Sequence, residues 1–132
     1  MNLGSKDNKK RTHGFLKSFA FAFAGIKSAL MKERNLQIHV VISIAVILLG
    51  GVLSISRIEW IMILFAIGGM LSLELMNTAI ERVVDLATED YHPLAKQAKD
   101  IAAGAVLVYA ALCIIIGIIV FLPRILAYII SL

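Results

Sequence analysis

The stretch that decides the fold is Ile101–Leu122, IAAGAVLVYAALCIIIGIIVFL, which contains no charged residue. An α-helix rises about 1.5 Å per residue, so a helix of this length crosses the hydrocarbon core of a bilayer, about 30 Å thick. Pro123 and Arg124 follow it and mark a boundary. The stretch therefore predicts a membrane-spanning helix.

The composition of the whole chain agrees with a membrane protein. Of its 132 residues 60% are hydrophobic and 17% are charged, and the mean hydropathy is +0.89. Soluble domains are nearer half apolar and about a quarter charged, so soluble, disordered and secreted disulfide-rich classes are excluded. The net charge of +4 fits membrane topology better than nucleic-acid binding, and we expect no nucleic-acid partner. The single cysteine, Cys113, has no partner and suits apolar packing.

Two further apolar stretches, Ile38–Ile55 and Trp60–Leu73, lie before Ile101–Leu122 in the chain. The second has only 14 uncharged residues before Glu74, so its helix spans the membrane only if it continues with a polar face sheltered from lipid. We expect a single all-α domain over 1–132. Its parts are a flexible basic tail over 1–12, an amphipathic surface helix over 13–35, and transmembrane helices over 36–57, 60–86 and 98–122.

The surface helix is predicted from a one-sided apolar stripe with helical spacing. A cleaved signal peptide is the alternative, but Lys17 interrupts an already short apolar core. The stripe consists of Phe15, Phe19, Phe23, Ile26 and Leu30.

The distribution of basic residues predicts the orientation. Eight of the 13 Lys and Arg residues precede the predicted span 36–57, which places the N-terminus in the cytoplasm. Three spans then place the region 74–100 in the cytoplasm as well, and the C-terminus outside.

Four polar residues form one stripe on the second predicted spanning helix: Glu74, Asn77, Glu81 and Asp85. The stripe climbs about 16 Å from within the membrane toward its cytoplasmic surface. A carboxylate as deep as Glu74 is costly in lipid, so it marks a candidate functional site. Such a group suits proton abstraction from an alcohol, and Glu81 beside Asn77 has the oxygen chemistry to hold Mg²⁺.

A structural interpretation of the stripe stays open. Its members can instead hydrogen-bond across helices or form salt bridges with Arg82, Lys96 or Lys99.

Two further elements are able to complete the site. Glu33 shares the face of the apolar stripe and is a candidate second metal ligand. Alternatively, it is an interfacial charge paired with Lys32 or Arg34. Tyr91 and His92 precede Pro93, which suits the first position of a helix. A helix N-terminus beside Lys96 and Lys99 attracts phosphate, although such lysines also occur as plain flanking charges.

No Walker A motif and no G-x-G-x-x-G motif is present. His13, His39 and His92 lack the spacing of a zinc site. Any nucleotide site must therefore be assembled from helices.

The runs ELMNTAIERVVD, residues 74–85, and HPLAKQAKDIAAGAV, residues 92–106, closely resemble the signature of the prokaryotic diacylglycerol kinase family. These are small integral-membrane lipid kinases, and the resemblance covers about residues 14–122. The stretch Glu33-Arg34-Asn35 resembles most the undecaprenol kinase branch. The resemblance implies a homotrimer of three-span subunits that share active sites.

The resemblance also implies roles for individual residues. Glu74 corresponds to the catalytic base, and Glu33 and Glu81 to the Mg²⁺ ligands. Where diacylglycerol-specific members carry an arginine, this chain has Gly14, so Arg11 or Lys17 is a candidate substitute; Phe21 and His39 also depart from that branch. The implied ATP-binding set is Glu33, Asn77, Glu81, Asp90, Tyr91, His92, Lys99 and Asp100, with Asp85 and Lys17 in support.

We therefore expect Mg²⁺- and ATP-dependent phosphorylation of a membrane lipid alcohol, undecaprenol first and diacylglycerol as the alternative. An ion-translocating subunit would also explain a buried Glu74, but it leaves Glu33 and Lys99 without a role. A non-catalytic membrane assembly protein, with the stripe joining helices, is a third class of answer.

Overall fold

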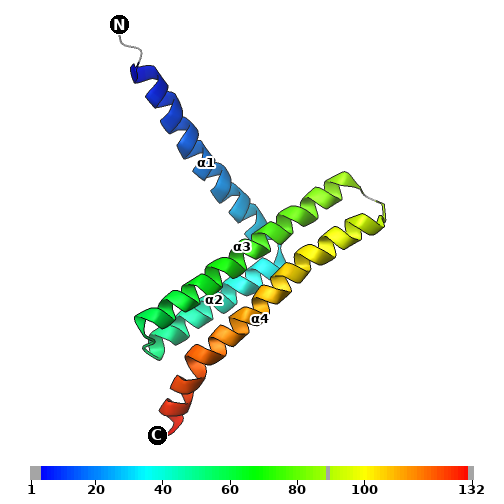
Figure 1. Ribbon diagram of the computed structural model, residues 1–132. Coiled ribbons are helices and arrows are strands. Elements are labelled where there is room, and N and C mark those ends of the chain that lie inside the picture. Colours follow the sequence, from blue (N-terminus) through cyan, green and yellow to red (C-terminus); the bar gives the residue numbers. More distant parts are fainter. Residues whose placement is uncertain (1–3, 89, 131–132) are drawn as a thin grey trace. The chain divides into compact units, whose positions relative to one another are not determined.

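The protein is all-helical over residues 4–88 and 90–130, which the computed structural model describes, with side chains described from residue 14 onward (Figure 1). The four helices are α1 (Gly4–Lys32), α2 (Arg34–Val52), α3 (Arg57–Ala87) and α4 (Pro93–Ile130), and no strand occurs in these residues. The all-α prediction is confirmed.

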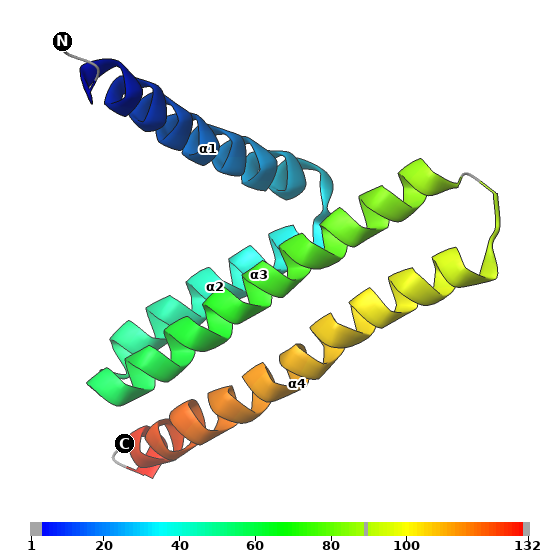
Figure 2. The ribbon, with the colours of Figure 1, turned by 45° about the horizontal axis from the view of Figure 1, so that its top comes forward.

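The chain divides into two compact units, one ending at Glu33 and the other beginning at Arg34. Helix α1 makes up the first unit. In the second, α2 and α4 both pack against α3, which lies at the centre of the three-helix bundle (Figures 1 and 2). The polar stripe therefore lies on the central helix.

Helix α1 corrects one prediction. It begins at Gly4, so residues 4–12 are helical where a flexible tail was expected; residues 1–3 lie outside the described part. The stretch Ser5–Thr12 contains no Pro or Gly, and its lysines and arginine are good helix formers. Side chains of the apolar stripe are exposed, and the rings of Phe15 and Phe19 meet edge to face at 4.9 Å.

The turn between α2 and α3 is fixed by a capping box. The Ser56 hydroxyl accepts a hydrogen bond from the Glu59 backbone N–H, and the Glu59 carboxylate accepts one from the Ser56 N–H. Ser54 has φ of 49°, a conformation that non-glycine residues adopt mainly in turns. Next to this turn, a Cβ on Gly50 would stand 3.1 Å from the Trp60 ring, so a small residue is needed there.

Arg124 of α4 ties this end of the bundle together. Its guanidinium donates two hydrogen bonds to the Glu59 carboxylate, at 2.5 and 3.2 Å. It also donates to the carbonyls of Leu53 and Ser54 in the turn, at 3.3 and 3.0 Å. A small apolar core lies nearby and is made of Ile55, Ile63, Val120 and Phe121.

Helices α3 and α4 approach closely halfway along the bundle. A Cβ on Gly69 would overlap the Tyr109 side chain, whose hydroxyl donates to the Phe65 carbonyl at 2.9 Å. Helix α4 begins at Pro93, as predicted, and therefore starts before the expected span 98–122; it also continues beyond Leu122 and Pro123 to Ile130. A proline costs a helix one hydrogen bond but does not have to end it.

In the described part of the chain, four helical segments are long and apolar enough to cross a membrane: 14–32 of α1, and α2, α3 and α4. Most large hydrophobic side chains on them are exposed, which suits contact with lipid. The prediction of three spans and a surface helix stays a prediction, because length and composition also allow residues 14–32 to span.

Candidate active site

The polar stripe of α3 runs from buried to exposed. Glu74 and Asn77 are buried, with 3% and 7% of their surfaces exposed. Glu81, one turn farther on, is half-buried, and Asp85 is exposed. Thr78 is also buried, at 5%, and was missed in the sequence although it lies about 40° from Glu74 on a helical wheel.

Asn77 and Glu81 form one oxygen-rich unit. The Asn77 Nδ2 group donates a hydrogen bond to Glu81 Oε1 at 3.0 Å. The Asn77 Oδ1 atom is buried, and within the described residues it accepts no hydrogen bond. An unpartnered buried oxygen is costly unless a ligand satisfies it. An amide oxygen and a carboxylate are the hard donors that Mg²⁺ prefers, so the donor set fits this ion.

Two ion pairs hold the candidate phosphate-binding lysines. Lys99 Nζ of α4 lies 2.5 Å from Asp85 Oδ1 of α3, and Lys96 Nζ lies 2.6 Å from Asp100 Oδ2 one turn along its own helix. The Lys99 side chain is 39% exposed and that of Asp85 is 65% exposed. The salt-bridge interpretation of the stripe is thus confirmed for Asp85.

A cavity of about 340 Å³ lies beside the α3–α4 connection. The Thr88 hydroxyl shapes this connection by donating to the Asp90 carbonyl and accepting from the Asp90 N–H. The cavity brings together six residues that were singled out in the sequence for phosphate or nucleotide contact or support: Asp85, Asp90, Tyr91, His92, Lys96 and Lys99.

The remaining predicted residues lie apart from this cavity. Glu74, Asn77 and Glu81 lie deeper along α3, and Asp100 does not line the cavity. Glu33 and Lys17 belong to the other unit. Glu33 is half-buried and its N–H closes the last turn of α1 on the Ala29 carbonyl at 2.8 Å, whereas Lys17 is exposed.

Among the described side chains, those of residues 14–88 and 90–130, no group of three or more His, Cys, Asp or Glu is gathered for a metal. The assignment of Glu81 as a Mg²⁺ ligand stays a prediction.

Comparison with known proteins identifies the family. The model of the prokaryotic diacylglycerol kinase family matches residues 20–121. The undecaprenol kinase of Bacillus subtilis is 50% identical over 122 residues, 92% of this chain and 99% of that protein. A Synechocystis diacylglycerol kinase is 42% identical over 85% of this chain and 65% of its own length. The Escherichia coli diacylglycerol kinase is 26% identical, over 79% and 88% of the two chains.

The chain belongs to the prokaryotic diacylglycerol kinase family. This membership confirms the resemblance drawn from the two sequence runs, and with it the prediction of a membrane lipid kinase. The matched region contains the whole stripe and the α3–α4 connection. The roles of the individual residues stay predictions.

Proposed function

We propose that this protein transfers the γ-phosphate of ATP to the hydroxyl of undecaprenol, forming undecaprenyl phosphate and ADP. The near full-length identity to a protein named undecaprenol kinase supports this substrate. Diacylglycerol, with phosphatidic acid as product, is the second candidate, because other relatives are named diacylglycerol kinases. The observation that carries the proposal is the buried Glu74 carboxylate at the deep end of a stripe that rises to a lysine-containing cavity.

In this proposal Glu74 is the general base. The lipid hydroxyl loses its proton to the Glu74 carboxylate as its oxygen attacks the γ-phosphorus in line. The new O–P bond forms while the bond from the γ-phosphorus to the β,γ-bridging oxygen breaks, and ADP leaves with that electron pair. Phosphoryl transfer needs little covalent help from the protein, so positioning and charge stabilisation provide most of the rate enhancement.

Lys99 changes partner during this cycle. Its ion pair with Asp85 is partly exposed, and exposed pairs contribute only about 0–1 kcal/mol. A polyphosphate carries more negative charge than one carboxylate, so ATP competes well for the ammonium group. Asp85 pairs with Lys99 only until the nucleotide arrives and displaces it. Asn77, Asp90, Tyr91, His92 and Asp100 complete the nucleotide contacts.

In this proposal Glu33 and Glu81 would each supply a carboxylate oxygen to Mg²⁺, and Asn77 would supply its amide oxygen. When bound, this ion neutralises phosphate charge and draws electron density toward the leaving oxygen.

The proposed assembly is a homotrimer whose neighbouring subunits share active sites. Each subunit crosses the bacterial cell membrane three times, with the N-terminus and the active site in the cytoplasm and the C-terminus outside. The excess of basic residues before α2 supports this orientation.

The test is a transfer assay in mixed micelles. Labelled ATP and Mg²⁺ are supplied with undecaprenol or with diacylglycerol, side by side, and Glu74→Gln is the blank. Faster transfer to undecaprenol is expected. Preference for diacylglycerol would keep the chemistry and replace the substrate, and transfer to neither lipid would refute the proposed function.

A further inference from the structure

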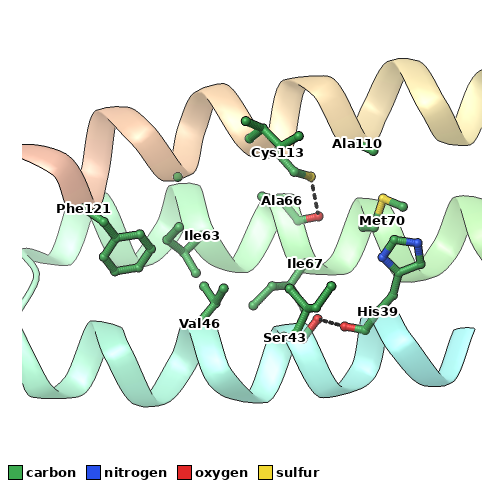
Figure 3. Close-up of a pocket in the computed structure, with 13 residues that line it drawn as sticks. His39, Ser43, Val46, Ile63, Ala66, Ile67, Met70, Ala110, Cys113 and Phe121 are labelled. Atoms are coloured by element: carbon green, nitrogen blue, oxygen red, sulfur yellow. Dashed lines mark hydrogen bonds between the residues drawn. The ribbon is translucent and has the colours of Figure 1, made fainter. Parts of the chain in front are cut away.

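A groove of about 360 Å³ lies within the three-helix bundle, between α2 and α4, with α3 as its floor (Figure 3). Helix α3 contributes Ile63, Ala66, Ile67 and Met70. Figure 3 shows Phe121 beside Ile63 toward one end and His39 beside Met70 toward the other. None of the lining residues belongs to the polar stripe or to the cavity beside the α3–α4 connection.

The few polar side chains of the groove are turned onto the backbone. The Ser43 hydroxyl donates to the His39 carbonyl at 2.7 Å, and the Cys113 thiol donates to the Ala66 carbonyl at 3.6 Å. Apart from the His39 imidazole, the lining is therefore apolar. An apolar, flexible ligand fits such a surface better than a polar one.

The floor of the groove leads to the candidate catalytic carboxylate. Ile63, Ile67, Met70 and Glu74 follow one another at helical intervals of four, three and four residues, so they share one face of α3. From Ile63 to Glu74 the helix rises about 16 Å, roughly half of a hydrocarbon core about 30 Å thick. A chain lying in the groove would thus present its end at Glu74.

We propose that this groove binds the hydroxyl-proximal part of the substrate's hydrocarbon chain and delivers the hydroxyl to Glu74. The inference rests on the proposed function and names the subsite for its lipid. The groove ends near Phe121, so it contacts only the first portion of a long chain, and the remainder lies in the bilayer. Affinity should rise with chain length until the chain reaches Phe121 and then stay constant.

Two neighbouring alanines of α4 offer a matched test. Ala110 lines the groove, whereas Ala111 is exposed and does not line it. Ala110→Leu places three extra carbons in the groove, and Ala111→Leu places the same three outside it. We expect Ala110→Leu to raise the KM for a long-chain lipid alcohol about tenfold. The KM for ATP and the KM for an alcohol with a very short chain should stay within twofold of wild type.

Gly117→Leu is a second groove variant, because Gly117 lines the groove and a Cβ there meets no atom within 4 Å. It should reproduce the effect of Ala110→Leu without disturbing packed neighbours. Equal KM values for the lipid in Ala110→Leu and Ala111→Leu, together with a wild-type value for Gly117→Leu, would overturn the proposal.

A photocrosslinking experiment separates this proposal from the proposed function. The full-length protein in vesicles is irradiated with a polyprenol that carries a diazirine within its first few isoprene units, and adducts are mapped by mass spectrometry. Adducts should concentrate on groove residues of α2 and α4, decrease with excess unlabelled polyprenol, and disappear in Ala110→Leu but not in Ala111→Leu.

Adducts spread evenly over the exposed faces of α2 and α4 would overturn the groove assignment, even if the wild type transfers phosphate to the lipid. The same conclusion would follow if Ala110→Leu altered the oligomer size with no polyprenol-dependent adducts, because another subunit would then fill the groove. Absence of transfer to either lipid would refute the proposed function, and the adduct map would still decide whether the chain binds here.

Discussion

Helix α3 carries an interhelical ion pair near each of its ends, and the two differ in how firmly they are held. Near its beginning, Glu59 receives two hydrogen bonds from Arg124, which also binds two carbonyls of the α2–α3 turn. Near its end, Asp85 receives one short contact from Lys99. The side chains of the first pair are 30% and 24% exposed, those of the second 39% and 65%.

This difference indicates a structural role for the Arg124–Glu59 pair and an exchangeable partner for Lys99. A planar guanidinium that binds a carboxylate with two hydrogen bonds and also caps backbone carbonyls fixes both direction and distance. A lysine with one exposed partner exchanges that partner readily. The Arg124 end therefore holds three helices together, while the Lys99 end is the one that we propose for phosphate binding.

The largest expected effect lies at the functional end. Glu74→Gln should fold and insert yet lower phosphate transfer about 10³-fold, because a positioned general base contributes roughly 10²–10⁴-fold. The measurement is transfer from labelled ATP to the lipid alcohol. Glu59→Gln, at the opposite end of α3, is the control and should keep its turnover. Wild-type activity in Glu74→Gln would disprove the assignment of the base.

Lys99→Ala should have the second-largest effect on activity. Loss of a charged phosphate ligand should raise the KM for ATP about tenfold or more, since hydrogen bonds to charged groups contribute roughly 1.5–3 kcal/mol. Lys96→Ala is the comparison, because Lys96 pairs with Asp100 on its own helix and should have a smaller effect. Initial rates at varied ATP concentration measure both. The same KM for ATP in Lys99→Ala and Lys96→Ala would show that the lysine paired with Asp85 is not the main phosphate ligand.

Asp85→Asn should act in the opposite direction and more weakly. Removal of the competing carboxylate frees Lys99 for ATP, and the KM should fall, by no more than about fivefold, given the small energy of an exposed ion pair. The same kinetic assay tests this. A KM raised as far as in Lys99→Ala would instead mean that Asp85 holds Lys99 in its productive position.

The smallest effect on activity is expected at the end of α3 where Glu59 pairs with Arg124. Glu59→Gln should lower the thermal stability of the bundle and leave kcat unchanged. The hydrogen bonds from Arg124 first, and then those from Ser56, lower the pKa of Glu59 from 4.5 to about 2. A lowered folded-state pKa adds stability above pH 4.5 that is lost as the pH falls toward 2.

Melting temperatures in micelles at pH 7, 4 and 2 test this linkage. The difference in melting temperature between the wild type and Glu59→Gln should be largest at pH 7, smaller at pH 4 and nearly absent at pH 2. A gap that does not depend on pH would show that the loss comes from altered packing of the turn rather than from the ionised carboxylate.

Much of the site's layout follows from local rules. Residues at helical spacing share a face whatever surrounds the helix, so the stripe of Glu74, Asn77, Glu81 and Asp85 was predictable. Pro93 starts α4 because a proline lacks only an N–H that the first helical position does not use. The basic segment 4–12 was misjudged, since its polarity indicated a tail while its residues favour a helix.

The sequence by itself determined the helical class, the membrane setting, the family and the polar stripe, because each depends on composition, spacing or a contiguous motif. Only the tertiary structure decided that Asp85 pairs with Lys99, that Arg124 binds Glu59 across 65 positions of the chain, and that an apolar groove leads toward Glu74. Contacts between helices depend on their relative rotation and axial offset, and side-chain packing between the helices fixes both.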